Sequence, residues 1–307
     1  MVAEARGPRS LKVYGSSLDK LKRCKWWNRI EELEIYVFHD VEEKEIRSAL
    51  SAAAALRSLR LRFGTISGPS SPDEKISMPL LTHLELQSVH HLWPIDCPNL
   101  THLSLHSPFN IFGLEIRRIH LPHLRELSFS ATEFPENALR VFDIPPLHRF
   151  DFHCSLRKLV SANILNTLWD DFKPSGPREE PLPFCMEPEI FSITNTLVNL
   201  KVLARVLAYR VFLQELHMTA MEITSEPFEA LLPVQPLRCS KRARRAWYIT
   251  CPTLKRIVID FAGHKVKQER GILEASARKL VVARSKVSAP FERFTMRYSE
   301  NKFVELV

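Results

Sequence analysis

The chain repeats one short pattern of apolar and polar positions along most of its length. Each copy has an apolar residue, two variable residues, a second apolar residue, one variable residue and a third apolar residue. The copies occupy residues 30–35, 56–61, 81–86, 100–105, 124–129, 147–152, 197–202, 213–218, 254–259 and 291–296, with a shortened copy at 8–13. Alternation of apolar and polar residues is typical of a β-strand with one buried side. The pattern therefore predicts one strand per copy.

The spacing of the copies predicts how these strands assemble. The middle apolar residues of the first six copies lie 19 to 26 residues apart, close to the roughly 20–29 residues of leucine-rich repeats. Because a return segment joins each strand to the next, neighbouring strands should run parallel and stack. We predict an α/β fold: an irregular leucine-rich-repeat solenoid, or horseshoe, with a parallel concave sheet and helical or irregular convex segments. Its strands are expected in one curved sheet, centred near residues 33, 59, 84, 103, 127, 150, 200, 216, 257 and 294.

The segments between the strands carry their own signals. Five copies have a proline two residues before their first apolar residue, namely Pro79, Pro98, Pro122, Pro145 and Pro252. Proline ends a preceding helix and favours extended backbone before it, so we expect it to stop the return segment. Apolar residues at helical spacing predict helices over 43–56, 157–172 and 269–286, and a helix start at 225–228. We expect a single domain over residues 1–307, with loop insertions at 173–190 and 233–248.

The composition is that of a folded protein and argues against several classes of site. Apolar residues make up 45% of the chain, and only 8 residues are Gly. No G-x-G-x-x-G or G-x-x-x-x-G-K-[ST] motif is present, which disfavours a phosphate-binding loop. The six cysteines form no C-x-x-C pair, which disfavours a structural zinc site or a disulfide scaffold. With no apolar run near the ~20 residues of a membrane span and no signal peptide, we expect a cytoplasmic or nuclear protein without a membrane partner.

The net charge of +8 is concentrated near the C-terminus. Residues 238–307 hold 17 Lys or Arg against 6 Asp or Glu. Five of these basic residues form a cluster that contains no acid: Arg238, Lys241, Arg242, Arg244 and Arg245. The cluster is either a solvated loop or a nuclear localisation signal, with phosphate binding as a third interpretation. Binding to nucleic acid is not favoured, because no recognised nucleic-acid fold accompanies the cluster.

The concave face of the sheet is the candidate partner-binding surface. Side chains between the apolar positions of each strand point to this face. On four adjacent strands they are His83, Glu85, Gln87, His102, Ser104, His106, Glu126, Ser128, Ser130, Arg149, Asp151 and His153. Solenoids commonly bind partners on such a face, so we expect a protein partner here. The alternative is a solvated face without a ligand.

No catalytic or metal-binding pattern in the sequence supports an enzyme. The chain has no G-x-S-x-G and no H-E-x-x-H motif. His102 and His106 are four residues apart in a predicted strand, which separates them by ~13 Å and prevents them from sharing one ion. Asp170 and Asp171 are expected to be a solvated pair at a helix end. We therefore expect no catalytic residue, no metal and no cofactor.

Two stretches resemble a known family. Cys-Pro-Asn-Leu-Thr-His-Leu-Ser-Leu at 97–105 and Cys-Pro-Thr-Leu-Lys-Arg-Ile-Val-Ile at 251–259 are similar to the irregular leucine-rich repeats of fungal F-box proteins, those of mushrooms especially. The resemblance implies a right-handed horseshoe and a role as substrate receptor of a cullin-RING ubiquitin ligase. In that family an N-terminal F-box binds the small Skp adaptor, and the repeats bind the protein to be ubiquitinated.

The chain departs from that family in two respects. The Asn or Cys that usually follows the strand is replaced at the matching positions, which are Gly64, Val89, Pro108 and Thr132. The first repeat begins near Pro8, so a Skp adaptor is an expected partner only if an F-box lies upstream. Residues 182–191 resemble the opening of an F-box but lie in a Pro-rich loop within the array, and we do not assign them that role. The alternative function is a leucine-rich-repeat scaffold without a ligase link, which binds a protein or an acidic partner.

Overall fold

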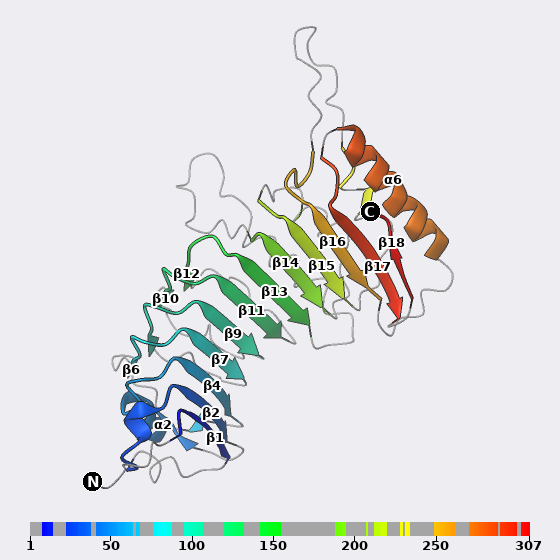
Figure 1. Ribbon diagram of the computed structural model, residues 1–307. Helices are drawn as coiled ribbons and strands as arrows, with labels where there is room; N and C mark the ends of the chain where they lie inside the picture. The colour runs from blue at the N-terminus through cyan, green and yellow to red at the C-terminus, as the bar shows by residue number, and fades with distance from the viewer. Residues whose placement is uncertain are drawn as a thin grey trace, which may run out of the picture. The chain divides into compact units, whose positions relative to one another are not determined.

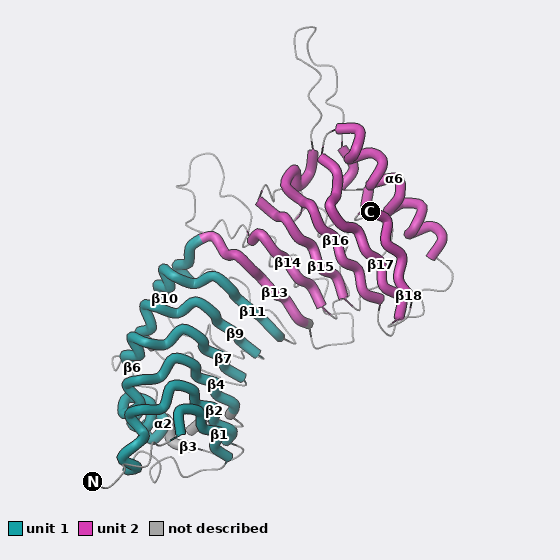
Figure 2. The backbone as a smooth tube through the Cα atoms, viewed as in Figure 1, with its two compact units in different colours: residues 1–131, 138–145 teal, residues 132–137, 146–307 magenta. Residues whose placement is uncertain are grey.

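The computed structural model describes most of the repeat strands and the segments that lead into them. The described residues are 8–14, 23–37, 41–63, 66–67, 76–87, 95–106, 119–131, 142–154, 188–194, 207, 212–219, 228–229, 231–233, 249–261, 270–287, 289–299 and 302–307. The chain divides into two compact units, one of residues 1–131 and 138–145 and one of residues 132–137 and 146–307 (Figure 2).

Unit 1 is built on six parallel strands that follow one another in chain order (Figure 1). They are β1 (Ser10–Tyr14), β2 (Glu32–Val37), β4 (Ser58–Phe63), β7 (His83–Gln87), β9 (His102–His106) and β11 (Glu126–Ala131). Shorter strands precede several of them and pair in parallel: β3 (Val41–Glu42) with β5 (Ile66–Ser67), β6 (Ile76–Ser77) with β8 (Ile95–Asp96), and β10 (Ile119–His120) with β12 (Phe142–Asp143). The described helical segments of the unit are η1 (Trp27–Arg29) and α2 (Glu43–Ser51).

Unit 2 continues the same construction and ends differently. Its parallel strands are β13 (Arg149–Cys154), β14 (Ile190–Thr194), β15 (Glu215–Thr219), β16 (Arg256–Asp260) and β17 (Arg293–Ser299). The last strand, β18 (Lys302–Glu305), pairs with β17 in the antiparallel direction. The helix α6 (Arg270–Lys286) connects β16 to β17. The fold is thus α/β, with mostly parallel sheets and few helices among the described residues, as the sequence predicts.

The core is a stack of apolar side chains contributed two per strand. In unit 1 the register aligns Leu33, Leu59, Leu84, Leu103 and Leu127, and each is at most 4% exposed. In unit 2 the same position is held by Phe150, Phe191, Leu216, Ile257 and Phe294. Burying a side chain of this size stabilises a protein by about 1.5–3 kcal/mol. No strand can do this alone, because its partners are the strands beside it.

A tight turn brings the chain into several of the strands. In unit 1 the amide N–H of Leu81 donates to the carbonyl of Met78 at 3.1 Å, and Leu100 repeats the bond to Cys97 at 3.1 Å. Pro79 and Pro98 therefore occupy the second position of a β-turn, which their fixed φ favours. The expectation that these prolines end a helix is wrong, because the two-residue strands β6 and β8 precede them.

A shared carbonyl sets the register of successive repeats. At β2, β4, β7, β9, β11, β15, β16 and β17, the residue before the strand and the first residue of the strand donate their backbone N–H groups to one carbonyl of the preceding repeat. Thr82 and His83 bond the carbonyl of Arg57 at 2.8 and 3.0 Å, and Thr101 and His102 bond that of Thr82 at 2.9 and 3.0 Å. A slip by one residue would lose these bonds and turn the apolar side chains to the opposite face of the sheet.

The structure confirms most predicted strands and corrects two details. The described strands include those predicted near residues 33, 59, 84, 103, 127, 150, 216, 257 and 294. The strand predicted near residue 200 lies outside the described residues, and an unpredicted strand, β14, stands between β13 and β15. The predicted insertion at 173–190 therefore ends too late, since Ile190 already belongs to β14. The insertion predicted at 233–248 is described only at Pro233. The antiparallel β18 departs from an all-parallel sheet.

The helices agree with the prediction where they are described. The helix expected over 43–56 is α2, which ends earlier, at Ser51, and buries Ile46 and Leu50. The helix expected over 269–286 is α6. The helix predicted over 157–172 lies outside the described residues, and of the start predicted at 225–228 only Phe228 is described, as helical. Neither α2 nor α6, nor any other helix in the described ranges, is long and apolar enough to span a membrane.

A buried arginine fixes α6 to the rest of unit 2. The helix buries Leu273, Ala277, Leu280 and Arg284 on one side. The Arg284 guanidinium donates to the backbone carbonyls of Thr250 at 2.9 Å and Cys251 at 3.0 Å, and its Nε donates to that of Ala289 at 3.1 Å. Burial lowers the pKa of Arg284, although a guanidinium stays charged in proteins. Backbone oxygens and the ring of Phe291, 4.8 Å from the guanidinium carbon, surround the charge.

The stack of apolar side chains in the core predicts that shortening a side chain at its centre strongly lowers the free energy of unfolding. Leu103 is 3% exposed and lies in register between Leu84 and Leu127. Leu103→Ala should therefore lower the free energy of unfolding by about 2–5 kcal/mol in chemical denaturation. Leu80→Ala is the control, because Leu80 is 43% exposed and its loss should cost about 0.5 kcal/mol or less. Equal effects of the two substitutions would contradict the register.

Candidate partner-binding surface

The predicted surface residues of unit 1 lie together on one face of the sheet. We call this face, formed by the alternate side chains of β1, β2, β4, β7, β9 and β11, the unit 1 polar face. Strand register places the nine predicted residues in three rows: His83, His102 and Glu126; Glu85, Ser104 and Ser128; Gln87, His106 and Ser130. All of them are half-buried except His83, which is exposed. The rows follow from the same alternation that buries the leucines on the other face.

A row of alternating charges crosses five strands of this face. Lys12 Nζ lies 3.1 Å from Glu34 Oε2, and Arg60 bridges Glu34 Oε1 at 3.0 Å and Glu85 Oε2 at 2.6 Å. His106 Nε2 then lies 3.6 Å from Glu85 Oε1. We call these five residues the charge row. Its members on β1, β2 and β4 were not among the predicted site residues.

The charge row holds the carboxylate of Glu34 in the ionised form. The Tyr36 hydroxyl donates to Glu34, and together with the hydrogen bonds from Arg60 and Lys12 it lowers the pKa of Glu34 to about 2, against an opposing effect of burial. The hydrogen bonds to Glu34 and Glu85 raise the pKa of Arg60. Each cation therefore has an anion beside it at neutral pH, and the row carries little net charge.

Two stacked imidazoles lie next to the charge row. The rings of His83 and His102 are 4.1 Å apart between centroids and 10° from parallel. Each Nδ1 lies within 2.9 Å of the hydroxyl of the preceding threonine, Thr82 or Thr101. His102 Nε2 also lies 3.3 Å from Glu126 Oε1. Partial desolvation of the His83 ring, which the neighbouring His102 ring partly covers, and next the charge of His102 lower the pKa of His83, while Glu126 opposes the shift. Two positive charges at this distance would repel each other.

Two stacked tyrosine rings lie at the β1 end of the charge row. The rings of Tyr14 and Tyr36 stack with centroids 5.0 Å apart, and Lys12 Nζ lies 4.7 Å from the Tyr36 centroid. Tyr14 is 64% exposed. An exposed aromatic ring beside charged groups offers both apolar contact and hydrogen bonding, the combination enriched in protein interfaces.

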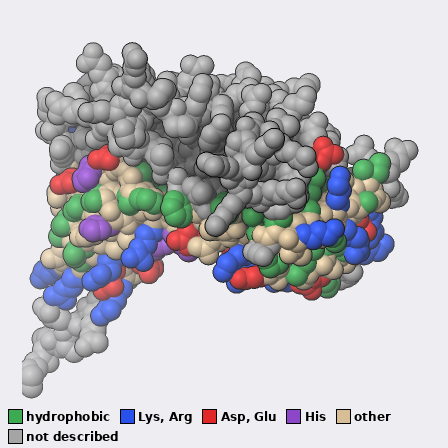
Figure 3. All heavy atoms as spheres, turned by 90° about the horizontal axis from the view of Figure 1, so that it is seen from above, with side chains coloured by type: hydrophobic (Ala, Val, Ile, Leu, Met, Phe, Trp, Pro, Cys, Tyr) green, Lys and Arg blue, Asp and Glu red, His purple; other side chains and the backbone are tan. Residues whose placement is uncertain are grey.

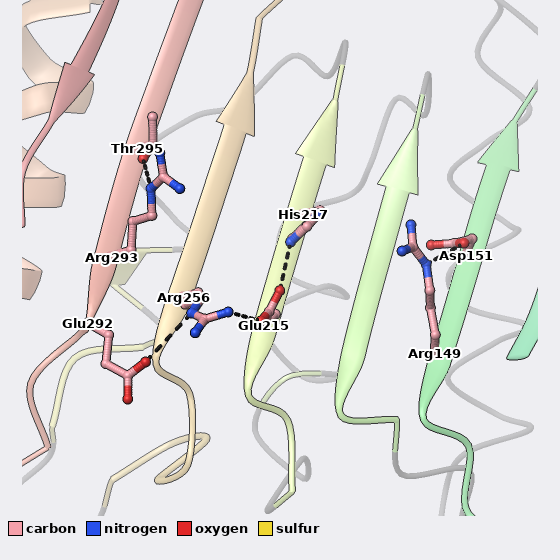
Figure 4. A network of polar contacts seen from close by, with 8 residues as sticks. All are labelled: Arg149, Asp151, Glu215, His217, Arg256, Glu292, Arg293 and Thr295. Carbon is pink, nitrogen blue, oxygen red and sulfur yellow. Dashed lines mark hydrogen bonds and ion pairs between the residues drawn. The ribbon is translucent and has the colours of Figure 1, made fainter. Parts of the chain in front are cut away.

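Unit 2 carries a second polar face with its own network (Figure 4). Arg149 Nε lies 2.7 Å from Asp151 Oδ2 on β13, where His153 occupies the next alternate position. On β15 and β16, Glu215 accepts from Arg256 at 2.7 Å and contacts His217 Nε2 at 3.3 Å. The carboxylate of Glu292 lies 3.6 Å from the other side of Arg256. The residues from β15 and β16 were not among the predicted site residues.

Two polar atoms on this second face are buried and have no hydrogen-bond partner among the described residues. They are Asp151 Oδ1 and Ser192 Oγ, on strands that pair in register. Ser192 is 8% exposed, and His217 is its register neighbour on β15. An unpaired buried polar group costs about 1–3 kcal/mol.

The remaining chemical groups are the candidate metal ligands, the cysteine thiols and the charged clusters. Among the described residues, no three His, Cys, Asp or Glu side chains are arranged to hold a metal ion. Burial raises the pKa of the Cys97 thiol to about 12, so the reactive thiolate is suppressed at neutral pH. The basic cluster from Arg238 to Arg245 and the acidic pair at 170–171 lie outside the described residues.

The sequence was also compared with known proteins. No family model matches the chain, and no curated protein matches its sequence. The functional argument therefore rests on the geometry of the two polar faces.

The charge row predicts a pH-dependent contribution to stability. The pKa of Glu34, about 2, lies below the ordinary value, so its ionised form favours the folded state above pH ~4.3 and this contribution is lost as the pH falls toward 2. Glu34→Gln should lower the free energy of unfolding by about 1 kcal/mol at neutral pH. Denaturation at several pH values should show the two proteins converging as the pH falls. A difference independent of pH would contradict an electrostatic role.

The stacking of the two rings predicts that the pKa of His83 depends on the presence of His102. His102→Ala removes a like charge and a covering ring, both of which lower the pKa of His83. The pKa of His83, measured from the NMR shifts of its ring, should therefore rise in the variant. His120→Ala is the control, because His120 belongs to β10 and pairs with Asp143 instead. An unchanged His83 pKa in His102→Ala would show that the rings are not coupled.

Proposed function

We propose that the chain is a protein-interaction module of the leucine-rich-repeat type, which binds a protein partner on its polar faces. The observation that supports it is the strand register, which gathers polar side chains from successive repeats into rows on one face. A repeated unit with a buried leucine side and an ordered polar side is the construction that solenoid binding proteins use. The same repeats support the proposal of an irregular horseshoe.

The partner chemistry is inferred from how the charges are arranged. In the charge row each cation contacts a carboxylate, and on the one face that Figure 3 shows, the coloured part carries both basic and acidic side chains. A surface for nucleic acid needs Lys and Arg that are available to neutralise phosphates. Mixed donors and acceptors beside exposed tyrosine fit a protein surface better.

The resemblance to fungal F-box proteins extends the proposal to a substrate receptor of a cullin-RING ubiquitin ligase. In this form the repeats bind the protein to be ubiquitinated, and the Skp adaptor binds an F-box upstream of them. The chain would act in the cytoplasm or nucleus as a binding subunit and not as an enzyme. The genomic sequence before Met1 tests the extension: an in-frame F-box supports it, and its absence favours a scaffold without a ligase link.

Charge-bearing substitutions on the polar face test the binding proposal. Ser104 and Ser128 are adjacent in register and half-buried, so the double variant Ser104→Arg and Ser128→Arg places two long cations where a partner would lie. Proteins crosslinked to the wild-type chain in cells should be identified by mass spectrometry and compared with those of the variant. The proposal predicts that specific partners fall by about tenfold or more, as hot-spot loss does.

The control is a serine-to-arginine substitution outside the main sheet. Ser77 is exposed on β6, outside the main sheet, and Ser77→Arg should retain every partner. Circular dichroism and chemical denaturation establish that the variants are folded. If folded Ser104→Arg, Ser128→Arg protein retains the partners of the wild type, the polar face of unit 1 is not the binding surface.

A further inference from the structure

The helix α6 has two different faces, and only one of them is buried in unit 2. Leu273, Ala277, Leu280 and Arg284 form the buried side. On the opposite side lie two large apolar residues that remain exposed, Ile272 at 61% and Val282 at 53%. Exposed apolar side chains on a well-packed helix are an unused contact surface when they lie on one stripe.

The spacing of the exposed residues forms such a stripe. Residues 272, 275, 279, 282 and 286 are separated by three or four positions, which places them on one side of an α-helix. The side chains are Ile, Ala, Lys, Val and Lys, and all five are exposed. We call them the outer stripe. Its spacing is that of the a and d positions by which one helix packs along another.

The charge around the outer stripe is positive. Lys279 and Lys286 belong to the stripe, and Arg278 adjoins it. The only acid of α6 is Glu274, whose Oε1 is 2.7 Å from Arg270 Nε. The Tyr298 ring, 4.2 Å from the guanidinium carbon of Arg270, covers this pair. Among the described residues, no acid forms an ion pair with Lys279 or Lys286, so none of the described carboxylates neutralises the stripe.

A second copy of α6, a lipid surface and a helix of another protein would each need different side chains on the outer stripe. A second copy of α6 would bring lysines of the same sign against one another, which is unfavourable. A lipid surface is usually bound by helices rich in Trp, Phe and Leu, whereas the large apolar side chains here are only two, ~15 Å apart along the helix. An amphipathic helix with acidic flanks satisfies both features, since its apolar residues cover Ile272 and Val282 and its carboxylates meet the lysines.

We propose that the outer stripe of α6 is a docking site for an acidic amphipathic helix of a partner protein. Arg284 holds the stripe outward, because its bonds to the carbonyls of Thr250 and Cys251 fix the rotation of α6. The partner helix lies along α6, with apolar side chains between Ile272 and Val282. Its Asp or Glu side chains pair with Lys279 and Lys286. The site is separate from the polar faces and does not depend on them.

A designed peptide tests the proposal with the full chain. The probe is a fluorescent peptide of about three heptads, with Leu at a and d and Glu at e and g; the repulsion among its carboxylates keeps it monomeric. Binding is followed by fluorescence anisotropy. We expect saturable binding that weakens at high salt, as contacts between exposed charges do. The same peptide with Lys in place of Glu should not bind.

Matched variants locate the site. Lys279→Glu with Lys286→Glu, and separately Ile272→Gln with Val282→Gln, should each lower the affinity by about tenfold or more. All four side chains are exposed, and circular dichroism verifies that α6 persists. Lys44→Glu is the control, because Lys44 is an exposed lysine at the start of α2 in unit 1, and it should change the affinity by less than about twofold.

Three results would overturn the proposal. The first is the absence of peptide binding to the wild-type chain. The second is equal binding of the Glu and Lys peptides, or binding that neither double variant weakens. The third is binding only to vesicles of phosphatidylcholine with about 30% phosphatidylserine, tested in parallel, which would assign the stripe to a lipid surface. Since the polar-face variants leave α6 intact, failure here is distinguishable from failure of the proposed function.

Discussion

The burial of two apolar side chains per strand between neighbouring strands is the constraint on which the rest of the structure depends. Leu103, for example, is covered by Leu84 and Leu127 and has no equivalent partner within its own repeat. This requirement fixes the register of each strand to within one residue, since a slip would expose the whole apolar row. With the register fixed, the polar residues between the leucines are forced into rows as well. The charge row and the histidine stack are therefore consequences of how the core is packed.

The sequence predicts the strands well because burial imposes their pattern, and it fails where another residue takes an apolar position. Pro188, Phe191 and Ile193 have the repeat spacing with proline first, as Pro8 does before Leu11 and Val13 in β1. Pro188 is buried, so proline fills the place of leucine. The predicted repeats include the proline-first copy at 8–13 but not this one, so Ile190 falls within the loop predicted at 173–190. β18 carries no such pattern, because it pairs at the edge in the antiparallel direction.

The candidate surface was predictable in outline but not in its contacts. Alternation alone places His83, Glu85 and Ser104 on one face, and the structure places them there. Which side chains meet depends on the register between strands and on rotamers, neither of which a single sequence specifies. The stack of His83 on His102 is of this kind. Lys12, Glu34 and Arg60 occupy the same alternate positions on earlier strands, and extending the predicted row back to the first repeat would have found them.

The buried guanidinium of Arg284 limits how α6 can move relative to the rest of unit 2. If α6 leaves unit 2 altogether, water can solvate both the guanidinium and the carbonyls that it bonds, and the penalty comes from exposing Leu273, Ala277 and Leu280. If the helix instead slides by one turn or rotates in place, those carbonyls lose their donor while still buried, and the charge is left without partners. For these polar groups, a small displacement is therefore penalised more heavily than complete detachment. Arg284 therefore favours the seated position of α6 over small rotations or shifts of the helix.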